Sequence, residues 1–404
     1  MSFQTGLSGL NASSKNLDVI GNNIANSNTV GAKASRVEFS SVVASAIGPS
    51  GGGNAGGGIG VEVAKVSQQF SQGTINITGN NLDVAVNGGG FFQVQLADGS
   101  AAYTRDGQFK LDSKGNIMTN SGANLMGFTT DLLGTATSTS IVPLSIPTGA
   151  PIAAKSTETI AAEFNLDART VVAATATPPT PYTTYGTSLN AFDSQGVEVP
   201  VNMYFIKTAS DAWDVYDGDP AAGGTLLTAL TFDTTGNVVP PVAAIPITIT
   251  SSNPAIGAFP VSLDLSKATQ YGTTFAVSNL TQDGYTAGTL TGLSISDKGV
   301  ITTRYSNGQN QAKGQIALAD FRNVQGLKPV SAGNWVETST SGQPIQGQPG
   351  QGNFGELRAG SLESSNVDLT AELVAMMTAQ RDYQANAQTI KTQDQVLQTL
   401  VNLR

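Results

Sequence analysis

The stretch SNVDLTAELVAMMTAQRDYQANAQTIKTQDQVLQTLVNLR, residues 365–404, decides the fold of this chain. Its residues repeat at alternating steps of four and three, which is the a/d seam pattern of a coiled coil. The seam consists of Leu369, Leu373, Met376, Gln380, Tyr383, Ala387, Ile390, Asp394, Leu397 and Val401. This pattern predicts one long helix with an apolar stripe. Ser365 and Asp368 form a relaxed capping box, which we expect to set the start of the helix.

A second helical pattern lies at the N-terminus, in a segment without proline before Pro49. Apolar residues fall there at seven-residue steps, with two further residues widening the stripe: Phe3, Leu10, Leu17 and Ile24, then Leu7 and Ile20. The seam is imperfect because Ser14 and Gly21 occupy its interleaved positions. Such a helix needs tertiary packing to be stable. The two terminal helices therefore either form an intramolecular hairpin or complete their packing on neighbouring subunits, and we favour the second interpretation.

The composition argues against catalysis and against several kinds of partner. The chain has 404 residues, enough for two or three domains, and contains neither cysteine nor histidine. Disulfides, thiolate or imidazole metal sites and histidine-based nucleophile systems are thereby excluded. A net charge of −9 without a basic run disfavours nucleic acid as a partner. The sequence predicts no enzyme activity, no cofactor and no membrane span.

Between the terminal helices, the sequence is typical of β-structure. Residues 48–60 form a Gly-rich loop, whose single G-x-G-x-x-G match lacks the following helix that phosphate binding needs. From residue 73 onward, short alternating runs are separated by turn signals at Asp98-Gly99, Asp106-Gly107 and Lys114-Gly115, which predict hairpins.

The middle of the chain, residues 148–284, is rich in Pro, Thr, Ala and Ser and contains β-like segments at 199–206 and 213–216. Because the terminal helices are expected to meet, the chain must travel out and return, which favours nested domains. We therefore predict a mainly β multidomain fold with α-helical coiled-coil termini. Its expected parts are a terminal helical domain (1–28 and 365–404), a linker or hinge with the Gly-rich loop (29–72 and 355–364), a first β domain (73–147 and 285–354) and an inserted β domain (148–284).

Both ends of the chain resemble the flagellar hook proteins, within the family of bacterial rod, hook and hook-associated axial proteins. The stretch SGLNASSKNLDVIGNNIANSNTVGAK (8–33) resembles the Asn-rich box of that family, and residues 360–404 follow the hook pattern. The runs GGGFF (88–92), YTRDGQFKL (103–111) and GANLMGF (122–128) resemble its first globular domain. One departure is Ala32, where the family usually has an aromatic residue.

The resemblance implies a location and a route of export. Hook subunits leave the cell unfolded through the flagellar type III apparatus, without a cleaved signal peptide, and become extracellular. The family's short export-gate motif has a phenylalanine and, four residues later, an apolar residue. Phe39 and Val43 of FSSVV fit this motif here. Local packing of a half-buried strand is the alternative explanation for the same residues.

The function implied by the resemblance is a self-assembling subunit of the curved, flexible tube that links the basal-body rod to the filament. Its implied partners are other copies of the chain, the rod and hook–filament junction proteins, the hook cap and the export machinery. We expect the helical seams to carry the assembly contacts, through Leu10, Leu17, Ile24, Leu369, Leu373, Met376, Tyr383, Ile390 and Leu397. Hinges are expected at Gly51, Gly56, Gly352, Gly355 and Gly360.

Three alternatives remain open at this point. A distal rod or hook-associated protein would share the N-terminal box, although the long insertion at 148–284 favours the hook. A secreted carboxylate glycan hydrolase would need two acids across a cleft, and the sequence selects no such pair. A coiled-coil adhesin would trimerise in solution through its terminal helices.

Overall fold

The computed structural model describes residues 2–43, 58–147, 149, 151–173, 185–239 and 244–402. It divides into two compact units, which are treated separately below. Unit 1 comprises residues 1–149, 292–303 and 310–404, and unit 2 comprises residues 150–291 and 304–309. The predicted fold class is confirmed, because β-strands dominate and one helix lies at each end of the chain.

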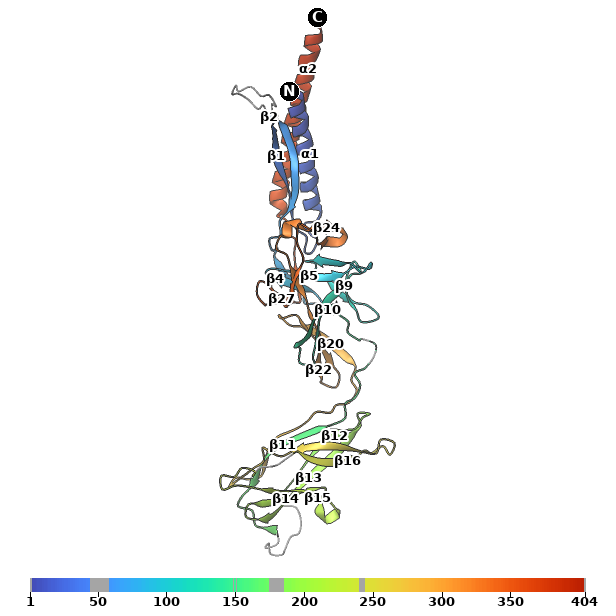
Figure 1. The fold of residues 1–404 in the computed structure, drawn as a ribbon, viewed down its shortest axis with the longest axis vertical. Helices are drawn as coiled ribbons and strands as arrows, with labels where there is room; N and C mark the ends of the chain where they lie inside the picture. Colours follow the sequence, from blue (N-terminus) through green and yellow to red (C-terminus); the bar gives the residue numbers. More distant parts are fainter. Residues whose placement is uncertain are drawn as a thin grey trace. The chain divides into compact units, whose positions relative to one another are not determined.

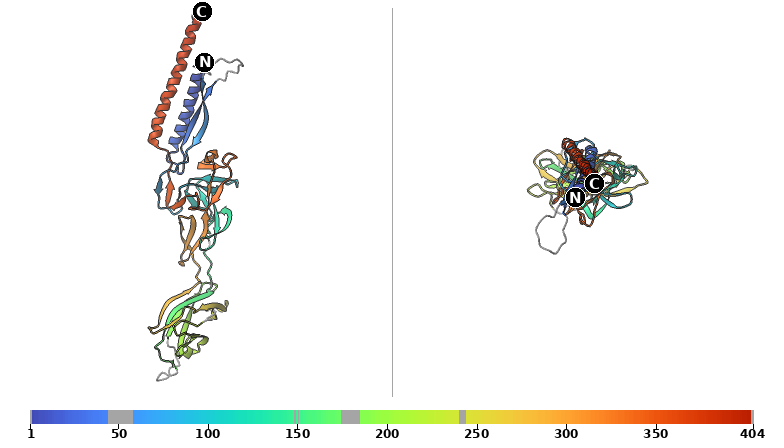
Figure 2. Two further views of the ribbon diagram at one scale, coloured as in Figure 1. Left: turned by 60° about the vertical axis from the view of Figure 1, so that its left-hand side comes forward. Right: turned by 90° about the horizontal axis from the view of Figure 1, so that it is seen from above.

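Two long helices form one end of unit 1. The N-terminal helix α1 (Ser2–Ala25) and the C-terminal helix α2 (Leu369–Asn402) lie side by side and antiparallel (Figures 1 and 2). The predicted capping box is wrong in detail. The helix starts at Leu369, and Asp368 is its cap, since Asp368 Oδ1 accepts hydrogen bonds from the backbone N–H groups of Thr370 (2.9 Å) and Ala371 (3.1 Å).

A long hairpin lies beside these helices, where the sequence predicted a linker. Strands β1 (Ser35–Val43) and β2 (Gly58–Gln68) pair antiparallel, and both contact α1 (Figure 1). The expected linker at 29–72 is therefore corrected for its described part. The physical reason is the alternation of apolar residues in both strands, which gives the hairpin an apolar face that includes Phe39 and Val61. Gly51 and Gly56 lie outside the described residues.

The remainder of unit 1 is an antiparallel β domain. Its largest sheet has the strand order β20-β21-β22-β9-β5-β6-β25-β24, with β7, β8, β10, β23 and β26 attached, and two small pairs, β27-β4 and β28-β3, complete it. The strands are β3 (Ile75–Ile77), β4 (Val84–Asn87), β5 (Phe91–Gln95), β6 (Ala101–Thr104), β7 (Phe109–Leu111), β8 (Ile117–Thr119), β9 (Asn124–Thr130), β10 (Ala136–Pro143), β20 (Leu290–Ile295), β21 (Val300–Tyr305), β22 (Asn310–Ile316), β23 (Leu318–Asp320), β24 (Lys328–Val330), β25 (Asn334–Val336), β26 (Ile345–Gly347), β27 (Glu356–Ala359) and β28 (Ser361–Glu363).

Aromatic side chains fill the core of this β domain. Phe91 packs edge-to-face on Trp335 with ring centroids 5.6 Å apart, and Tyr103 packs on Phe321 at 4.7 Å. Both geometries are favourable for aromatic rings. The strands that supply these side chains come from both flanks of unit 2 in the sequence, so the domain is complete only when both flanks are present.

The turn signal at Asp106-Gly107 does not form the predicted hairpin. The flanking strands β6 and β7 are not paired with each other, and the carbonyl of Gly107 accepts a hydrogen bond from Val84 N–H (3.0 Å) instead. A Cβ atom at position 107 would overlap the carbonyl oxygen of Val84. Glycine is therefore required here for the close approach of two backbones. The signals at Asp98-Gly99 and Lys114-Gly115 are confirmed as turns, between β5 and β6 and between β7 and β8.

We expect Gly107→Ala to destabilise unit 1 by about 3 kcal/mol, because the added methyl group has no space beside Val84. The matched control is Gly292→Ala in β20, where an added Cβ meets nothing within 4 Å and the change should be below about 1 kcal/mol. Denaturant unfolding followed by the fluorescence of Trp335 in unit 1 measures both. Equal midpoints for the two variants would contradict the overlap argument.

Unit 2 consists of two sheets with a shared core. The five-stranded sheet joins β16 (Ile245–Thr250), β17 (Ala258–Asp264), β11 (Thr159–Asp167), β18 (Thr269–Tyr271) and β19 (Ala276–Gln282). The four-stranded sheet has the order β12 (Tyr185–Phe192), β13 (Glu198–Ala209), β14 (Ala212–Asp217) and β15 (Thr225–Thr231). The core is centred on the fully buried Trp213, whose indole N–H donates to Gln270 Oε1 (2.7 Å).

Unit 2 extends beyond the inserted domain expected at 148–284. Its chain enters and leaves through an antiparallel ladder, with bridges between Ile152 and Gly288 and between Lys155 and Tyr285. The tip of the β21–β22 turn also belongs to it, because Ser306 N–H donates to the carbonyl of Thr289 (2.8 Å). The predicted strands at 199–206 and 213–216 correspond to β13 and β14.

Candidate assembly surface on the terminal helices

The two terminal helices approach closely because α1 presents small residues to α2. A Cβ atom built on Gly6 lies 3.1 Å from Ile390 Cγ1, and one built on Gly9 lies 2.9 Å from Asn386 Oδ1. Asn386 Nδ2 also donates to Ser13 Oγ (3.4 Å). The intramolecular hairpin of the sequence interpretation thus exists within one chain. It does not exclude contacts with neighbours, because much of α2 remains exposed.

A buried asparagine joins the other ends of the helices to the hairpin. The Nδ2 group of Asn23 donates to the carbonyl of Ser35 (2.7 Å) and to Glu372 Oε1 (2.9 Å), and its Oδ1 accepts from Ser35 N–H (2.9 Å). Because Asn23 is only 4% exposed, these bonds are shielded from water. One residue of the Asn-rich box therefore connects α1, β1 and the first turn of α2.

The predicted seam residues divide into two groups by their burial. Five of them are half-buried: Leu10, Leu17, Ile24, Met376 and Ile390, the last of which meets α1 at Gly6. Four are exposed within one chain: Leu369, Leu373, Tyr383 and Leu397. The buried apolar residues of the two helices are instead Ala12, Val19, Ile20 and Ala379. Of these four, only Ile20 was singled out from the sequence. The small residues Gly6, Gly9 and Ser13, at steps of three and four in α1, could have indicated where the two helices approach closely, but they do not point to these four residues.

The exposed apolar residues at the start of α2 form a continuous surface, which we call the free stripe. It consists of Leu369, Leu373, Val374 and Met377, each between 47% and 53% exposed. Their spacing of three and four residues places them along one side of the helix. Further along α2, Val396 and Leu397 are also half exposed. Because exposed apolar surfaces often serve as interaction sites, the free stripe is a candidate assembly surface.

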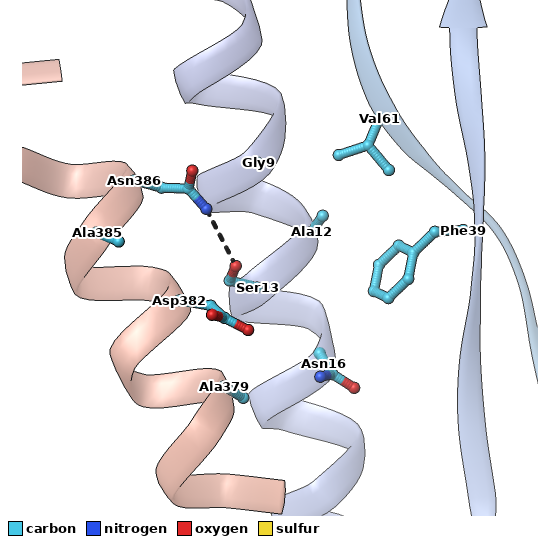
Figure 3. A pocket seen from close by; sticks show the side chains of 10 residues that line it. All are labelled: Gly9, Ala12, Ser13, Asn16, Phe39, Val61, Ala379, Asp382, Ala385 and Asn386. Carbon is cyan, nitrogen blue, oxygen red and sulfur yellow. Dashed lines mark hydrogen bonds between the residues drawn. The ribbon is translucent and has the colours of Figure 1, made fainter. Parts of the chain in front are cut away.

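A recess lies between the two helices and the hairpin (Figure 3). It has a volume of about 370 Å³, and small residues of both helices line it together with Phe39 and Val61. Asp382 supplies the one carboxylate among the side chains labelled in Figure 3. Phe39 is 45% exposed even though its ring faces this recess. We call this feature the helix–hairpin recess.

The export motif and the hinge glycines stay predictions. Phe39 lies in β1 at the helix–hairpin recess, and Val43 is the last residue of the same strand. Gly352 has a φ of +60° in an open turn. Gly355 N–H donates to the carbonyl of Gly89 (2.8 Å), and the carbonyl of Gly360 accepts from Thr78 and Gly79, so these two glycines are held by hydrogen bonds.

The part of the chain that the structure describes contains no cluster of three acidic side chains suited to a metal ion. Neither terminal helix, over its described length, is apolar enough to cross a membrane.

Comparison with known proteins covers the chain from end to end. Four family models match: Flagella basal body rod protein at residues 3–33, Flagellar hook protein FlgE/F/G D1 domain at 85–168, Flagellar basal body protein FlaE D2 domain at 165–285, and Flagellar basal body rod FlgEFG protein C-terminal at 358–403. The solved structure of Helicobacter pylori flagellar hook protein FlgE2 matches 72% of this chain and all of its own, with a TM-score of 0.56 and 15% identity, which supports the fold.

Full-length relatives carry the assignment. The flagellar hook protein FlgE of Escherichia coli K12 is 41% identical over 419 residues, and that of Salmonella typhimurium is 41% identical over 420 residues; both matches cover all of each chain. The hook protein of Rhizobium meliloti is 34% identical and covers all of this chain and 98% of its own. The chain therefore belongs to the flagellar hook protein FlgE family.

Proposed function

We propose that this chain is the structural subunit of the bacterial flagellar hook. The observation that carries this proposal is the 41% identity to named hook proteins across the entire length, including both terminal helices. Membership of this structural family implies a role without catalysis, assembly with other copies of the chain and a location in the flagellum.

The assembly contacts are proposed to lie at the terminal helices. A helical polymer needs heterologous contacts, in which one surface of a subunit meets a different surface of the next. The free stripe and the helix–hairpin recess are two such surfaces of one chain. Apolar side chains of the stripe, such as Leu373 and Met377, are removed from water when they pack against a neighbouring subunit. This burial of apolar surface stabilises the contact.

The remaining partners follow from the place of a hook in the flagellum. We propose contacts with the rod at one end, with the hook–filament junction proteins at the other, and with the hook cap during growth. Export through the type III apparatus without a cleaved signal peptide is part of the same proposal, with Phe39 and Val43 as the candidate gate motif.

Complementation tests the proposed function directly. In a strain that lacks its own hook gene, this chain should restore curved hooks in electron micrographs and swimming motility. Straight rods capped by filaments would instead indicate a distal rod or hook-associated protein. Failure to form any tube from exported chain would remove the proposal.

We expect the amide-rich face of α2 to influence the passage of later subunits. Gln388, Gln395 and Gln398 are exposed within one chain, and amides offer hydrogen bonds without strong charge pairing. Replacing all three by Lys should permit hook assembly but slow the growth of the filament several-fold, with the defect easing as salt rises. Pulsed fluorescent labelling measures filament growth. Normal growth on complete mutant hooks would leave only a packing role for this face.

A further inference from the structure

Three charged side chains from distant parts of the sequence meet in a buried cluster in unit 1. Lys33 Nζ lies 2.6 Å from Glu363 Oε1, and Arg105 Nη1 lies 3.1 Å from Glu363 Oε2. The side chains of Lys33, Arg105 and Glu363 are 1%, 5% and 0% exposed. Arg105 Nη2 donates in addition to the carbonyl of Gly88 (2.8 Å). Glu363 is thus the shared anion of two cations that have almost no access to water, and the three side chains together carry one net positive charge.

The same glutamate also holds the backbone of two other segments. Its carbonyl accepts a hydrogen bond from Gly31 N–H (2.8 Å), and its Oε1 accepts one from Gly73 N–H (2.9 Å). Lys33 Nζ donates to the carbonyl of Ser71 (2.8 Å). Glu363 lies in the segment before α2, and its carboxylate therefore binds the segment after α1 through Lys33 and the segment after β2 through Gly73.

A second side chain repeats this arrangement beside the cluster. Asn366 Oδ1 accepts from Ala34 N–H (2.7 Å), and its Nδ2 donates to the carbonyls of Gln69 (2.7 Å) and Ser71 (3.1 Å). Three segments connect the terminal helices to the β domain: one after α1, one after β2 and one before α2. They are thus linked twice, first through Glu363 and again through Asn366.

Two glycines allow the segments to come this close. Gly31 has a φ of +68°, and a Cβ atom there would lie 2.6 Å from the backbone carbon of Arg105. A Cβ atom at Gly73 would overlap the carbonyl oxygen of Ser364. Backbones in direct contact on both sides of Glu363 leave no room for one segment to rotate against another.

The charges make this arrangement strongly dependent on Glu363. Burial lowers the pKa of Lys33, and the hydrogen bond to Glu363 opposes that shift. Removing one member of a buried ion pair leaves an uncompensated charge, which is far more damaging than losing an exposed pair. Removal of Glu363 would leave two cations without their shared anion, whereas removal of Lys33 would leave the pair between Arg105 and Glu363 intact.

We propose that Glu363 closes a buried charge lock that makes the junction between the terminal helices and the β domain of unit 1 a rigid joint. The lock is a property of one folded chain and does not depend on the proposed function. It joins positions 330 residues apart, so it forms only when the C-terminal segment has reached the N-terminal one. Parts of the two segments expected to form a linker or hinge, residues 31–34 and 69–73 with Glu363, are held together at this junction.

Hydrogen exchange of the purified full chain, read by mass spectrometry in peptides covering 29–35 and 70–75, tests the lock. Glu363→Gln keeps the size of the side chain and should speed exchange in both peptides roughly a hundredfold or more. Lys33→Met should change it less than about tenfold, because the remaining pair is neutral. The matched control is Glu38→Gln, which removes the exposed pair between Arg36 and Glu38 and should change nothing.

Peptides of unit 2 serve as an internal standard and should exchange at the same rate in all variants. The lock is refuted if Glu363→Gln behaves like Glu38→Gln, if both peptides exchange freely in the unaltered chain, or if Lys33→Met is the more damaging change. Should Glu363→Gln unfold unit 1 altogether, the unfolding midpoints followed by Trp335 must show the same rank order of the three variants. Any other order overturns the proposal.

Discussion

Leu373→Asp is expected to abolish tube assembly while leaving the single subunit folded. In one chain Leu373 is 47% exposed, so a carboxylate there remains hydrated and should cost less than about 1 kcal/mol of folding free energy. In an assembled tube the same position would be covered by a neighbour, and an unpaired buried charge costs about 3 kcal/mol or more at each contact. That cost raises the concentration needed for polymerisation at least a hundredfold.

The control for this variant is Thr389→Asp, an exposed polar position on the same helix, well beyond the free stripe. It introduces the same charge but removes no apolar contact, so polymerisation should be retained. Sedimentation of the polymer measures assembly, and the thermal unfolding of unit 1 reports the subunit. Normal tubes from Leu373→Asp, or equal loss in both variants, would show that the free stripe is not an assembly contact.

The helices could be predicted from sequence because their pattern is local, but their contacting faces could not. A straight helix rotates by about 20° per heptad relative to a perfect seven-residue repeat, so the predicted seam crosses the surface of α2. Which part of that surface faces α1 depends on Gly6 and Gly9, where α1 has no side chain. Near the start of α2 the contacting face was therefore missed by one position, since the seam named Leu373 whereas Glu372 bonds to Asn23; further along, the seam residue Ile390 does meet α1 at Gly6.

The charge lock shows a second limit of sequence reasoning. Lys33, Arg105 and Glu363 are ordinary charged residues in their local sequence, and nothing in their spacing connects them. Only the return of the chain past its own N-terminal segment brings them together. Glycines were interpreted as hinges for a related reason, since a glycine needed for close packing, such as Gly31 or Gly73, cannot be told from a flexible one by composition.

Excision of unit 2 is expected to leave unit 1 folded and as stable as it is in the full-length chain. Ile152 and Gly288 pair directly at the entrance of unit 2, with N–H···O bonds of 2.8 and 3.2 Å, so their backbones lie about 5.5 Å apart. A two-residue Asn-Gly turn can close this gap after removal of residues 153–287. The shortened chain should show only one of the two calorimetric unfolding transitions. Its tubes should still form but with altered curvature, because the region that matches the D2 domain model, residues 165–285, is missing.

The two tryptophans of the chain make this test specific, since Trp335 lies in the core of unit 1 and Trp213 in the core of unit 2. Trp213→Ala in the full-length chain should destabilise unit 2 by about 4 kcal/mol, because it empties the centre of that core. If the two units fold independently, neither this variant nor the excision should shift the unfolding of unit 1, followed by Trp335, by more than a few degrees. A shift of more than about 10 °C would mean that unit 2 stabilises unit 1. In that case unit 1 would not be stable on its own, and the inserted domain could not be treated as an independently folding unit.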